Sequence, residues 1–226
     1  MPTALVTGAN RGIGLALTQQ YASDGWRVHA CCRTPDAAEE LHGAGGDVTV
    51  HALDVTDHAA IDALAARIEE PVDLVLANAG VYGPGSDRQG FGSLDYDGFR
   101  HALEVNLLGA LKTLEAFLPH AERASGKLVA ITSKMGSIED ASSGMVIYRA
   151  SKAALNMSIA MLAPEAKARG VAVGLLHPGW ARTDMGGPNG LVSAEESAQG
   201  LRARIAALTP TDKPAFLAYD GQEIPW

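Results

Sequence analysis

The sequence predicts an α/β protein in which helices cover both faces of a parallel sheet. Short apolar runs that are typical of strands alternate with longer helical segments along all 226 residues. Most of the strand runs are apolar on both faces, as expected for strands that are buried in a parallel sheet. No linker, repeat or low-complexity segment interrupts the alternation, so we expect one domain over residues 1–226.

Composition and charge exclude several classes of protein. The net charge of −8 argues against a general nucleic-acid binder, which needs a basic surface. Because there is neither a charged leader nor a long apolar segment, we expect no signal peptide and no membrane span. The two cysteines, Cys31 and Cys32, are adjacent in an apolar run, and no Cys/His group has zinc spacing. We therefore expect a cytoplasmic protein without a metal site.

The first elements are typical of a dinucleotide-binding unit. A strand over Ala4–Val6 leads into a glycine-rich turn, a helix over Leu15–Ala22 and a second strand over Arg27–Cys32. The turn consists of Thr7, Gly8, Ala9, Asn10, Arg11, Gly12, Ile13 and Gly14. Glycines let the backbone approach a pyrophosphate, and the helix start offers it free N–H groups. Because the spacing departs from G-x-G-x-x-G, a tight turn without a ligand is the alternative.

The end of the second strand favours NADP(H) over NAD(H). NAD-binding sites usually have an acidic residue near this strand end for the ribose 2′-hydroxyl. This chain has Arg33 there, and a guanidinium suits a 2′-phosphate. Arg11, in the glycine turn, supplies a second cation. Surface arginines without a ligand are the alternative, since most arginines are exposed.

Strands and helices continue to alternate towards the C-terminus. Strands are expected at Val48–Leu53, Val72–Ala77, Leu128–Ile131, Val171–Leu176 and Ala215–Ala218. Helices are expected at Asp36–Leu41, Ala59–Ile68, Tyr96–Leu118, Tyr148–Ala168 and Ser193–Leu208. Thr56 or Asp57 can cap the second of these helices, and Ser193 with Glu196 fits a capping box. Asn106 is a polar amide inside the long third helix, where an exposed position is the alternative to a functional one.

Small and polar residues gather where the predicted strands end. Beyond the glycine turn, they are Arg33, Asp54, Val55, Asn78, Ala79, Gly80, Ser133, Pro178, Gly179 and Trp180. In open parallel sheets, ligands bind beyond the carboxyl ends of the strands. We therefore expect these residues to surround one cleft.

Tyr148 and Lys152 are four residues apart on a predicted helix. Their side chains should lie on one face, one above the other. An ammonium held beside a phenol favours the phenolate and lowers the pKa of the tyrosine. Such a tyrosine can exchange a proton with a substrate oxygen near neutral pH. A solvated helix face is the alternative, because the pair also arises by chance.

Taken together, these motifs resemble those of the short-chain dehydrogenases/reductases. The resemblance covers almost the whole chain, and its ordered motifs are Thr7-Gly8-x-x-x-Gly12-Ile13-Gly14, Asp54-Val55, Asn78-Ala79-Gly80, Asn106, Ser133, Tyr148-x-x-x-Lys152 and Pro178-Gly179. The short length and the ending Asp220 to Trp226 are similar to the sniffer and C-signalling-factor group of carbonyl-reductase-like proteins. The resemblance implies a Rossmann-type doubly wound sheet of seven strands, ordered 3-2-1-4-5-6-7.

The resemblance also implies an NADPH-dependent reduction of a ketone or aldehyde. Tyr148 would protonate the carbonyl oxygen, Ser133 would bind it, and Lys152 would lower the tyrosine pKa and bond the nicotinamide ribose. Asn106 would support a water linked to Lys152. Pro178 to Trp180 would line the nicotinamide and Thr183 would bind its carboxamide. Ser137 is a rival for the role of Ser133.

The sequence indicates the substrate, the direction of the reaction and the oligomeric state less directly than the cofactor. The short loop Ala181–Val192 contains three glycines, so we expect it to be mobile and the pocket open. The candidate lining residues, which favour an apolar or aromatic carbonyl compound, are Tyr82, Met135, Met145, Trp180 and Met185. A signalling protein with little turnover and an alcohol dehydrogenase are the alternative functions. The resemblance further implies a homodimer, with a tetramer as the alternative, through the helices Tyr96–Leu118 and Tyr148–Ala168.

Overall fold

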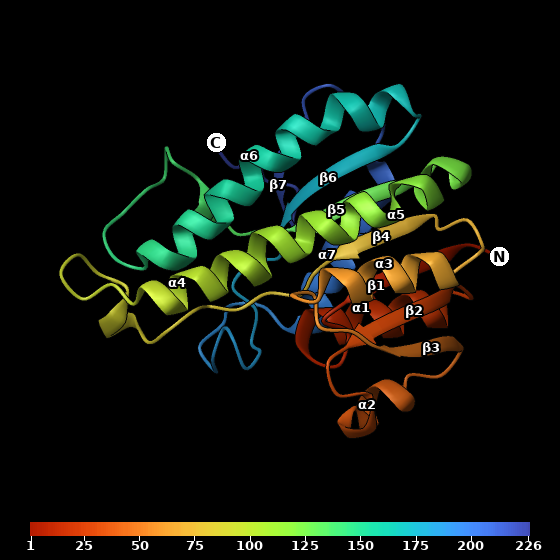
Figure 1. Cartoon of the computed structure of the whole chain (residues 1–226), viewed down its shortest axis with the longest axis horizontal. Coiled ribbons are helices and arrows are strands. Elements are labelled where there is room, and N and C mark those ends of the chain that lie inside the picture. The colour runs from red at the N-terminus through yellow and green to blue at the C-terminus, as the bar shows by residue number, and fades with distance from the viewer.

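Seven parallel strands form the centre of the computed structural model, which describes residues 1–226 (Figure 1). In chain order they are β1 (Thr3–Thr7), β2 (Arg27–Cys32), β3 (Asp47–Ala52), β4 (Leu74–Ala77), β5 (Lys127–Ile131), β6 (Ala172–His177) and β7 (Phe216–Ala218). Their spatial order is β3-β2-β1-β4-β5-β6-β7, and every neighbouring pair is parallel. The predicted Rossmann-type sheet and its strand order are confirmed.

Helices cover both faces of this sheet. They are α1 (Gly12–Ser23), α2 (Glu39–His42), α3 (His58–Arg67), α4 (Tyr96–Leu103), α5 (Ala110–Ala124), α6 (Val146–Ala168) and α7 (Ala194–Ala207). Helices α3, α5 and α6 pack on one face, and α1 and α7 pack on the other (Figure 1). None of the helices is both long and apolar enough to cross a membrane.

Successive side chains of each central strand enter two different hydrophobic cores. In β1, Leu5 contacts the core beneath α3, α5 and α6, whereas Ala4 and Val6 contact the core beneath α1 and α7. Phe117 on α5 and Leu17 on α1 are fully buried on these opposite faces. Burial on both faces explains why the strands are apolar without alternation. Each large side chain buried in this way contributes about 1.5–3 kcal/mol.

The strand order reverses at β1, and this reversal places the site. From β1 the chain runs outward to β2 and β3, and it then returns to β4 on the other side of β1. The connections that leave β1 and β4 therefore diverge and open a crevice at the carboxyl ends of these strands. The glycine turn Gly8–Gly14 follows β1, and Asn78–Gly80 follows β4.

The long helix before β5 has an irregular centre that the periodicity does not predict. Helices α4 and α5 are joined without a break by a π-helical segment, Glu104–Gly109, and α5 extends to Ala124. Asn106 lies within this segment and is fully buried, so the alternative of an exposed position is wrong. Short π-helical segments occur frequently at functional sites because they redirect one side chain.

Two predicted helix caps are observed, and one predicted helix is interrupted. Asp57 caps α3 by accepting a hydrogen bond from the backbone of Ala60. Ser193 and Glu196 form the predicted capping box at the start of α7. The helix predicted over Asp36–Leu41 is instead a 3₁₀ turn followed by α2, because Ala38 between them departs from helical dihedral angles.

Candidate active site

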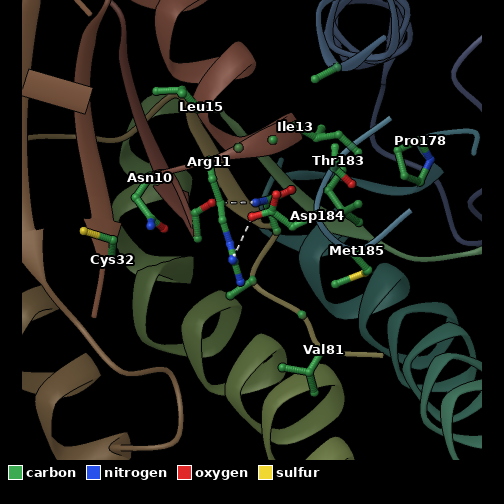
Figure 2. A pocket seen from close by; sticks show the side chains of 18 of the residues that line it. Asn10, Arg11, Ile13, Leu15, Cys32, Val81, Pro178, Thr183, Asp184 and Met185 are labelled. Atoms are coloured by element: carbon green, nitrogen blue, oxygen red, sulfur yellow. Dashed lines mark hydrogen bonds and ion pairs between the residues drawn. The ribbon is translucent and has the colours of Figure 1, made fainter. Parts of the chain in front are cut away.

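A cleft of about 690 Å³ lies at the carboxyl ends of the strands, where the crevice opens (Figure 2). Most of the predicted site residues line it, and these are Gly8, Asn10, Arg11, Gly12, Ile13, Gly14, Arg33, Asp54, Val55, Asn78, Ala79, Gly80, Tyr148, Lys152, Pro178 and Thr183. Asn106, Ser133, Gly179 and Trp180 are outside the lining. The predicted convergence of the strand-end residues is thus observed for all but a few of them.

The three glycines of the turn stand where a side chain would be strained or would clash. Gly8 and Gly12 have φ of +65° and +55°, a region that side chains disfavour. A Cβ atom on Gly14 would lie 2.2 Å from the carbonyl oxygen of Gly8 and 2.5 Å from Nδ2 of Asn78. The turn therefore presents bare backbone to the cleft at the start of α1, which is the arrangement that binds phosphate groups.

Asn78 braces the glycine turn from the neighbouring strand. Its Nδ2 donates hydrogen bonds to the carbonyl oxygens of Thr7 at 2.8 Å and Gly8 at 3.2 Å. In return, the hydroxyl of Thr7 accepts hydrogen bonds from the backbone N–H groups of Asn78 and Ala79. These bonds tie the ends of β1 and β4 together and hold both sides of the crevice in place.

Two arginines face the end of the cleft near β2. Arg33 follows β2 and is exposed, and its guanidinium has no hydrogen-bond partner in the protein. Arg11 pairs with Asp184 at 2.9 Å, which joins the glycine turn to the loop after β6 (Figure 2). Both side chains of this pair are largely exposed, so it contributes at most about 1 kcal/mol. Asp54, nearby, is held by hydrogen bonds from Thr56, which keep its pKa below the ordinary value.

Tyr148 lies at the opposite end of the cleft, in the first turn of α6. Its side chain is buried, and the hydroxyl of Ser133, which follows β5, lies close enough to the phenol to lower the pKa of Tyr148 in part. The hydroxyl of Ser133 also accepts a hydrogen bond from the backbone of Met135 at 3.2 Å. Ser137 is turned elsewhere, since its hydroxyl donates to the carbonyl of Trp226 and accepts from the backbone of Asp140. Of the two rival serines, it is therefore Ser133 that contacts the phenol.

Lys152 is buried one helical turn after Tyr148. Its ammonium donates a hydrogen bond to the carbonyl oxygen of Ile131 at 3.0 Å and lies 6.0 Å from the centre of the Tyr148 ring. A Cβ atom on Gly80 would lie 3.6 Å from Nζ of Lys152, so the turn after β4 passes directly beside the ammonium. Burial lowers the pKa of Lys152 to about 8.

The predicted effect of Lys152 on the pKa of Tyr148 is not found in the protein chain alone. Burial raises the pKa of Tyr148 to about 12, and the nearby hydroxyl of Ser133 offsets this only in part. The predicted direction is therefore wrong here, because removing the phenolate from water outweighs an ammonium that does not touch the phenol. At neutral pH the phenol is protonated.

Asn106 connects the turn after β4 to α6. Its Oδ1 accepts a hydrogen bond from the backbone of Val81 at 2.8 Å, and its Nδ2 donates to the carbonyl of Val81 and to the hydroxyl of Ser151. Ser151 immediately precedes Lys152. Asn106 therefore fixes the spacing between the cleft wall and the helix that carries Tyr148 and Lys152.

The loop after β6 is more tightly bonded than its glycines indicate. Ala181 and Val192 form a β-bridge across its base, and Nε1 of Trp180 donates to the carbonyl of Gly186 at 2.7 Å. A Cβ atom on Gly186 would lie 2.0 Å from the carbonyl oxygen of Ala181. The glycine at this position thus permits close packing, so it is not a sign of mobility. The mobility of the loop itself stays a prediction.

Several contributors to the cleft were not among the predicted site residues. Examples are Cys32, His101, Thr132, Arg182 and Asp184. Cys32 and Thr132 are at strand ends, so their position already indicated a place in the cleft. Arg182 and Asp184 flank the predicted Thr183. His101 reaches the cleft from α4, and nothing in its local sequence indicates this.

The fold and the cleft define a nucleotide-binding protein of the Rossmann type, with a serine, a tyrosine and a lysine gathered at one end of its site. The model of the short chain dehydrogenase family matches residues 2–191, and the chain belongs to this family.

The relatives include a dehydrogenase and a protein named C-signal. The chain is 38% identical to 1-hydroxy-2-glutathionyl-2-methyl-3-butene dehydrogenase of Rhodococcus sp. (strain AD45), with 100% of both chains covered. It is also 38% identical to C-signal of Myxococcus xanthus, over 69% of this chain and 93% of that protein.

Two solved structures show the same arrangement over the whole chain. One is the NADPH-bound carbonyl reductase from chicken fatty liver, with a TM-score of 0.90, 29% identity and coverage of 100% and 99%. The other is the carbonyl reductase Sniffer of D. melanogaster, with a TM-score of 0.92, 26% identity and full coverage of both chains. The predicted similarity to the sniffer and C-signalling-factor group is confirmed.

Proposed function

We propose that this protein is an NADPH-dependent carbonyl reductase in which Tyr148 is the general acid. The observation that carries the proposal is that Tyr148 and Lys152 line the same cleft as the glycine turn and two arginines, with Ser133 beside the phenol of Tyr148. The similarity to a carbonyl reductase that binds NADPH supports the cofactor and the reaction.

The residues of the cleft fit a dinucleotide with a 2′-phosphate. Gly8, Gly12 and Gly14 place no side chain of their own at the start of α1, where a pyrophosphate would lie. The guanidinium of Arg33 has no protein partner and suits a 2′-phosphate, and no acidic residue directly follows β2. Lys152, beside Tyr148, would bond the nicotinamide ribose, and Thr183, whose side chain lies beside Gly12, would bond the carboxamide. When bound, NADPH supplies the hydride.

The chain's own residues then bind and protonate the substrate oxygen. Ser133 donates a hydrogen bond to the carbonyl and orients it. Tyr148, which is protonated at neutral pH because burial raises its pKa to about 12, gives its proton to that oxygen as negative charge develops. The ammonium of Lys152 stabilises the tyrosinate that remains. Asn106 donates a hydrogen bond to the hydroxyl of Ser151, the residue before Lys152, and so fixes the position of Lys152 relative to the cleft wall.

Removal of the Tyr148 hydroxyl tests this mechanism. A panel of ketones, aldehydes and diones is assayed by NADPH oxidation, with NADH in parallel. Tyr148→Phe should reduce turnover about 10²- to 10⁴-fold, the range of general acid catalysis, and leave NADPH binding nearly unchanged. The exposed Tyr96→Phe is the matched control and should retain full turnover. Equal turnover in Tyr148→Phe and wild type would sink the mechanism, and tighter binding of NADH than NADPH would contradict the cofactor.

The relatives also favour two other functions. The similarity to C-signal supports a cofactor-binding signalling protein with little turnover. Full biological activity of a Tyr148→Phe strain would favour that function. The similarity to a dehydrogenase over the whole chain supports alcohol oxidation, which is measured with NADP⁺ and an alcohol panel.

A further inference from the structure

Helix α6 has no cap of its own at the end that carries Tyr148. The residue before it, Met145, has φ of +55° and makes no side-chain cap, and the first turn contains no acidic residue. The first four N–H groups of a helix have no partner within the helix. Two of them, on Val146 and Tyr148, bond to a single residue far back in the sequence, Gln89.

Gln89 is a fully buried glutamine, and every polar group of its side chain is used. Its Oε1 accepts a hydrogen bond from the backbone N–H of Tyr148 at 3.1 Å. Its Nε2 donates to the carbonyl oxygens of Tyr82 at 3.1 Å and Pro84 at 2.7 Å. One amide therefore joins the loop after β4 to the first turn of α6. Glutamine is rarely buried unless such bonds satisfy it.

The loop that Gln89 holds carries an aromatic partner of the reactive phenol. The rings of Tyr82 and Tyr148 are 4.6 Å apart between their centres and inclined by 37°. The hydroxyl of Tyr82 points to the sulfur of Met135, and the backbone of Met135 bonds to Ser133. Tyr82 is exposed to solvent, with 40% of its surface accessible, although its ring lies against Tyr148.

We propose that Gln89 is a positioning residue for the reaction, which holds Tyr148 through its backbone and through the ring of Tyr82. The inference rests on the proposed reductase function and deepens it. Gln89 itself does not line the cleft, so it acts through Tyr148 and Tyr82 without touching the cofactor site. Because the exposed ring of Tyr82 lies against Tyr148, we expect it to stack on a flat carbonyl substrate, so the preferred class is aromatic ketones, aldehydes and diones.

Two substitutions separate the bonds that Gln89 makes. Gln89→Met keeps the length of the side chain and removes all of its hydrogen bonds. Gln89→Glu keeps the oxygen that accepts from Tyr148 and removes the donors to Tyr82 and Pro84. Gln222→Met is the matched control, because Gln222 is exposed and only its backbone makes a hydrogen bond.

The kinetic test uses wild type and these variants with NADPH and two carbonyl substrates, one aromatic and one small aliphatic. Gln89→Met should lower kcat at least tenfold for both substrates, while the Kd for NADPH changes less than twofold. Gln89→Glu should lower kcat/KM for the aromatic substrate more than for the aliphatic one, because the donors to Tyr82 and Pro84 are lost while the acceptor for Tyr148 remains. Unchanged kinetics in Gln89→Met, or an equal loss of NADPH affinity, would overturn the proposal.

A second readout does not require activity. Amide hydrogen exchange in the first turn of α6, residues 146–149, should accelerate at least tenfold in Gln89→Met and stay unchanged in Gln222→Met. Unaltered exchange in Gln89→Met would overturn the inference, since Tyr148 would then be held without Gln89. If wild type reduces no carbonyl compound, the proposed function fails, and the exchange experiment still decides whether Gln89 positions Tyr148.

Discussion

At the scale of single residues, the site combines groups whose burial is costly. Lys152 is buried with its ammonium, and burial lowers its pKa to about 8 from the ordinary 10.5. Tyr148 beside it has a raised pKa. Buried charges without a salt-bridge partner reduce stability, and natural sites retain them where the charge serves the chemistry. We therefore expect that replacing Lys152 raises the stability of the fold and lowers the activity.

Lys152→Met should raise the free energy of unfolding by about 1–3 kcal/mol at pH 7 while abolishing carbonyl reduction and weakening NADPH binding. Methionine fills a similar volume without a charge to desolvate. The folded-state pKa is below the unfolded one, so wild type gains stability as pH rises from about 8 to 10.5. The advantage of the variant should shrink over that window. Urea unfolding at pH 7 and pH 10 measures both effects, and a less stable variant at pH 7 would contradict the prediction.

Sequence patterns predicted the residues of the site better than their interactions. The glycine turn and the pair Tyr148 and Lys152 are local motifs, so their spacing alone indicates their chemistry. The role of Gln89 depends on its hydrogen bond to Tyr148, which is 59 residues away in the sequence. No local sequence pattern indicates such a bond. The raised pKa of Tyr148 was missed for the same reason, because burial is a property of the folded chain.

At the scale of elements, strands and regular helices were predictable and irregular ones were not. The strand Arg27–Cys32 matches its prediction residue for residue, because a parallel strand buried on both faces is a continuous apolar run. The π-helical segment Glu104–Gly109 was not predicted, since the bonds of Asn106 to Val81 and Ser151 are tertiary. The sequence also does not show whether a glycine in the loop after β6 makes the loop mobile or permits close packing. Gly186 permits close packing.

The contact between that loop and the glycine turn leads to a prediction about cofactor affinity. Asp184 pairs with Arg11 and places a carboxylate at the edge of the cleft. An anionic cofactor is repelled by this carboxylate and must compete with it for Arg11. Asp184→Asn should therefore lower the Kd for NADPH about two- to fivefold at low salt, which is the size expected of one exposed ion pair.

A fluorescence titration of NADPH at two salt concentrations measures the effect. The difference between Asp184→Asn and wild type should shrink at high salt, because screening weakens exposed charges. Asp212→Asn is the matched control: it breaks the exposed pair with Lys167, which is outside the cleft, and should leave the Kd unchanged. Weaker binding of NADPH by Asp184→Asn would show that the carboxylate assists the cofactor.

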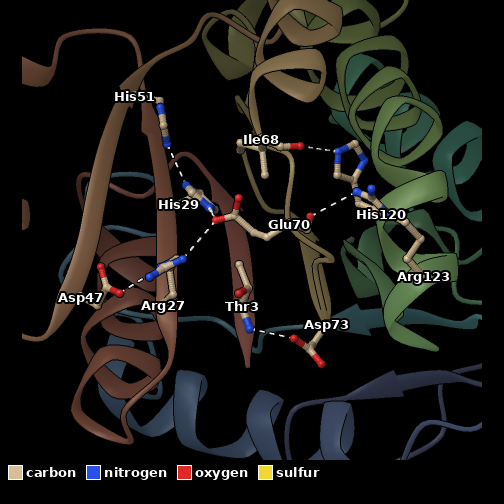
Figure 3. A network of polar contacts seen from close by, with 10 residues as sticks. All are labelled: Thr3, Arg27, His29, Asp47, His51, Ile68, Glu70, Asp73, His120 and Arg123. Carbon is tan, nitrogen blue, oxygen red and sulfur yellow. Dashed lines mark hydrogen bonds and ion pairs between the residues drawn. The ribbon is translucent and has the colours of Figure 1, made fainter. Parts of the chain in front are cut away.

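At the scale of the whole molecule, a histidine network at the edge of the sheet couples stability to pH. His51 on β3 bonds His29 on β2 at 2.9 Å, and His29 bonds Glu70 at 3.0 Å (Figure 3). Burial, with His29 as a second cause, lowers the pKa of His51 to about 4 from the ordinary 6.5. Between these values the unfolded chain binds the additional proton, so stability is lost as pH falls from 6.5 towards 4.

The expected loss from His51 is about 1–2 kcal/mol, after allowance for its partial exposure. Urea unfolding at pH 7.0 and pH 4.5 measures it in wild type and in His51→Gln, which lacks the titrating ring. The variant should lose about 1–2 kcal/mol less than wild type between the two pH values. An identical loss in both proteins would show that His51 does not contribute to acid destabilisation.

The outer faces of α5 and α6 lead to the last prediction, which concerns assembly. Met157 and Met161 are four residues apart on α6 and are 62% and 67% exposed, and Leu108 is exposed on the π-helical segment before α5. Residues at this spacing share one helix face, so the two methionines form an apolar strip that water disfavours. We expect a second copy of the chain to cover this strip in a homodimer, with a tetramer if a further face also pairs. Light scattering should give twice the monomer mass for wild type and the monomer mass for Met157→Glu with Met161→Glu. Leu191→Glu, an equally exposed change on the loop after β6, should leave the dimer intact, whereas a monomeric wild type would refute the assembly.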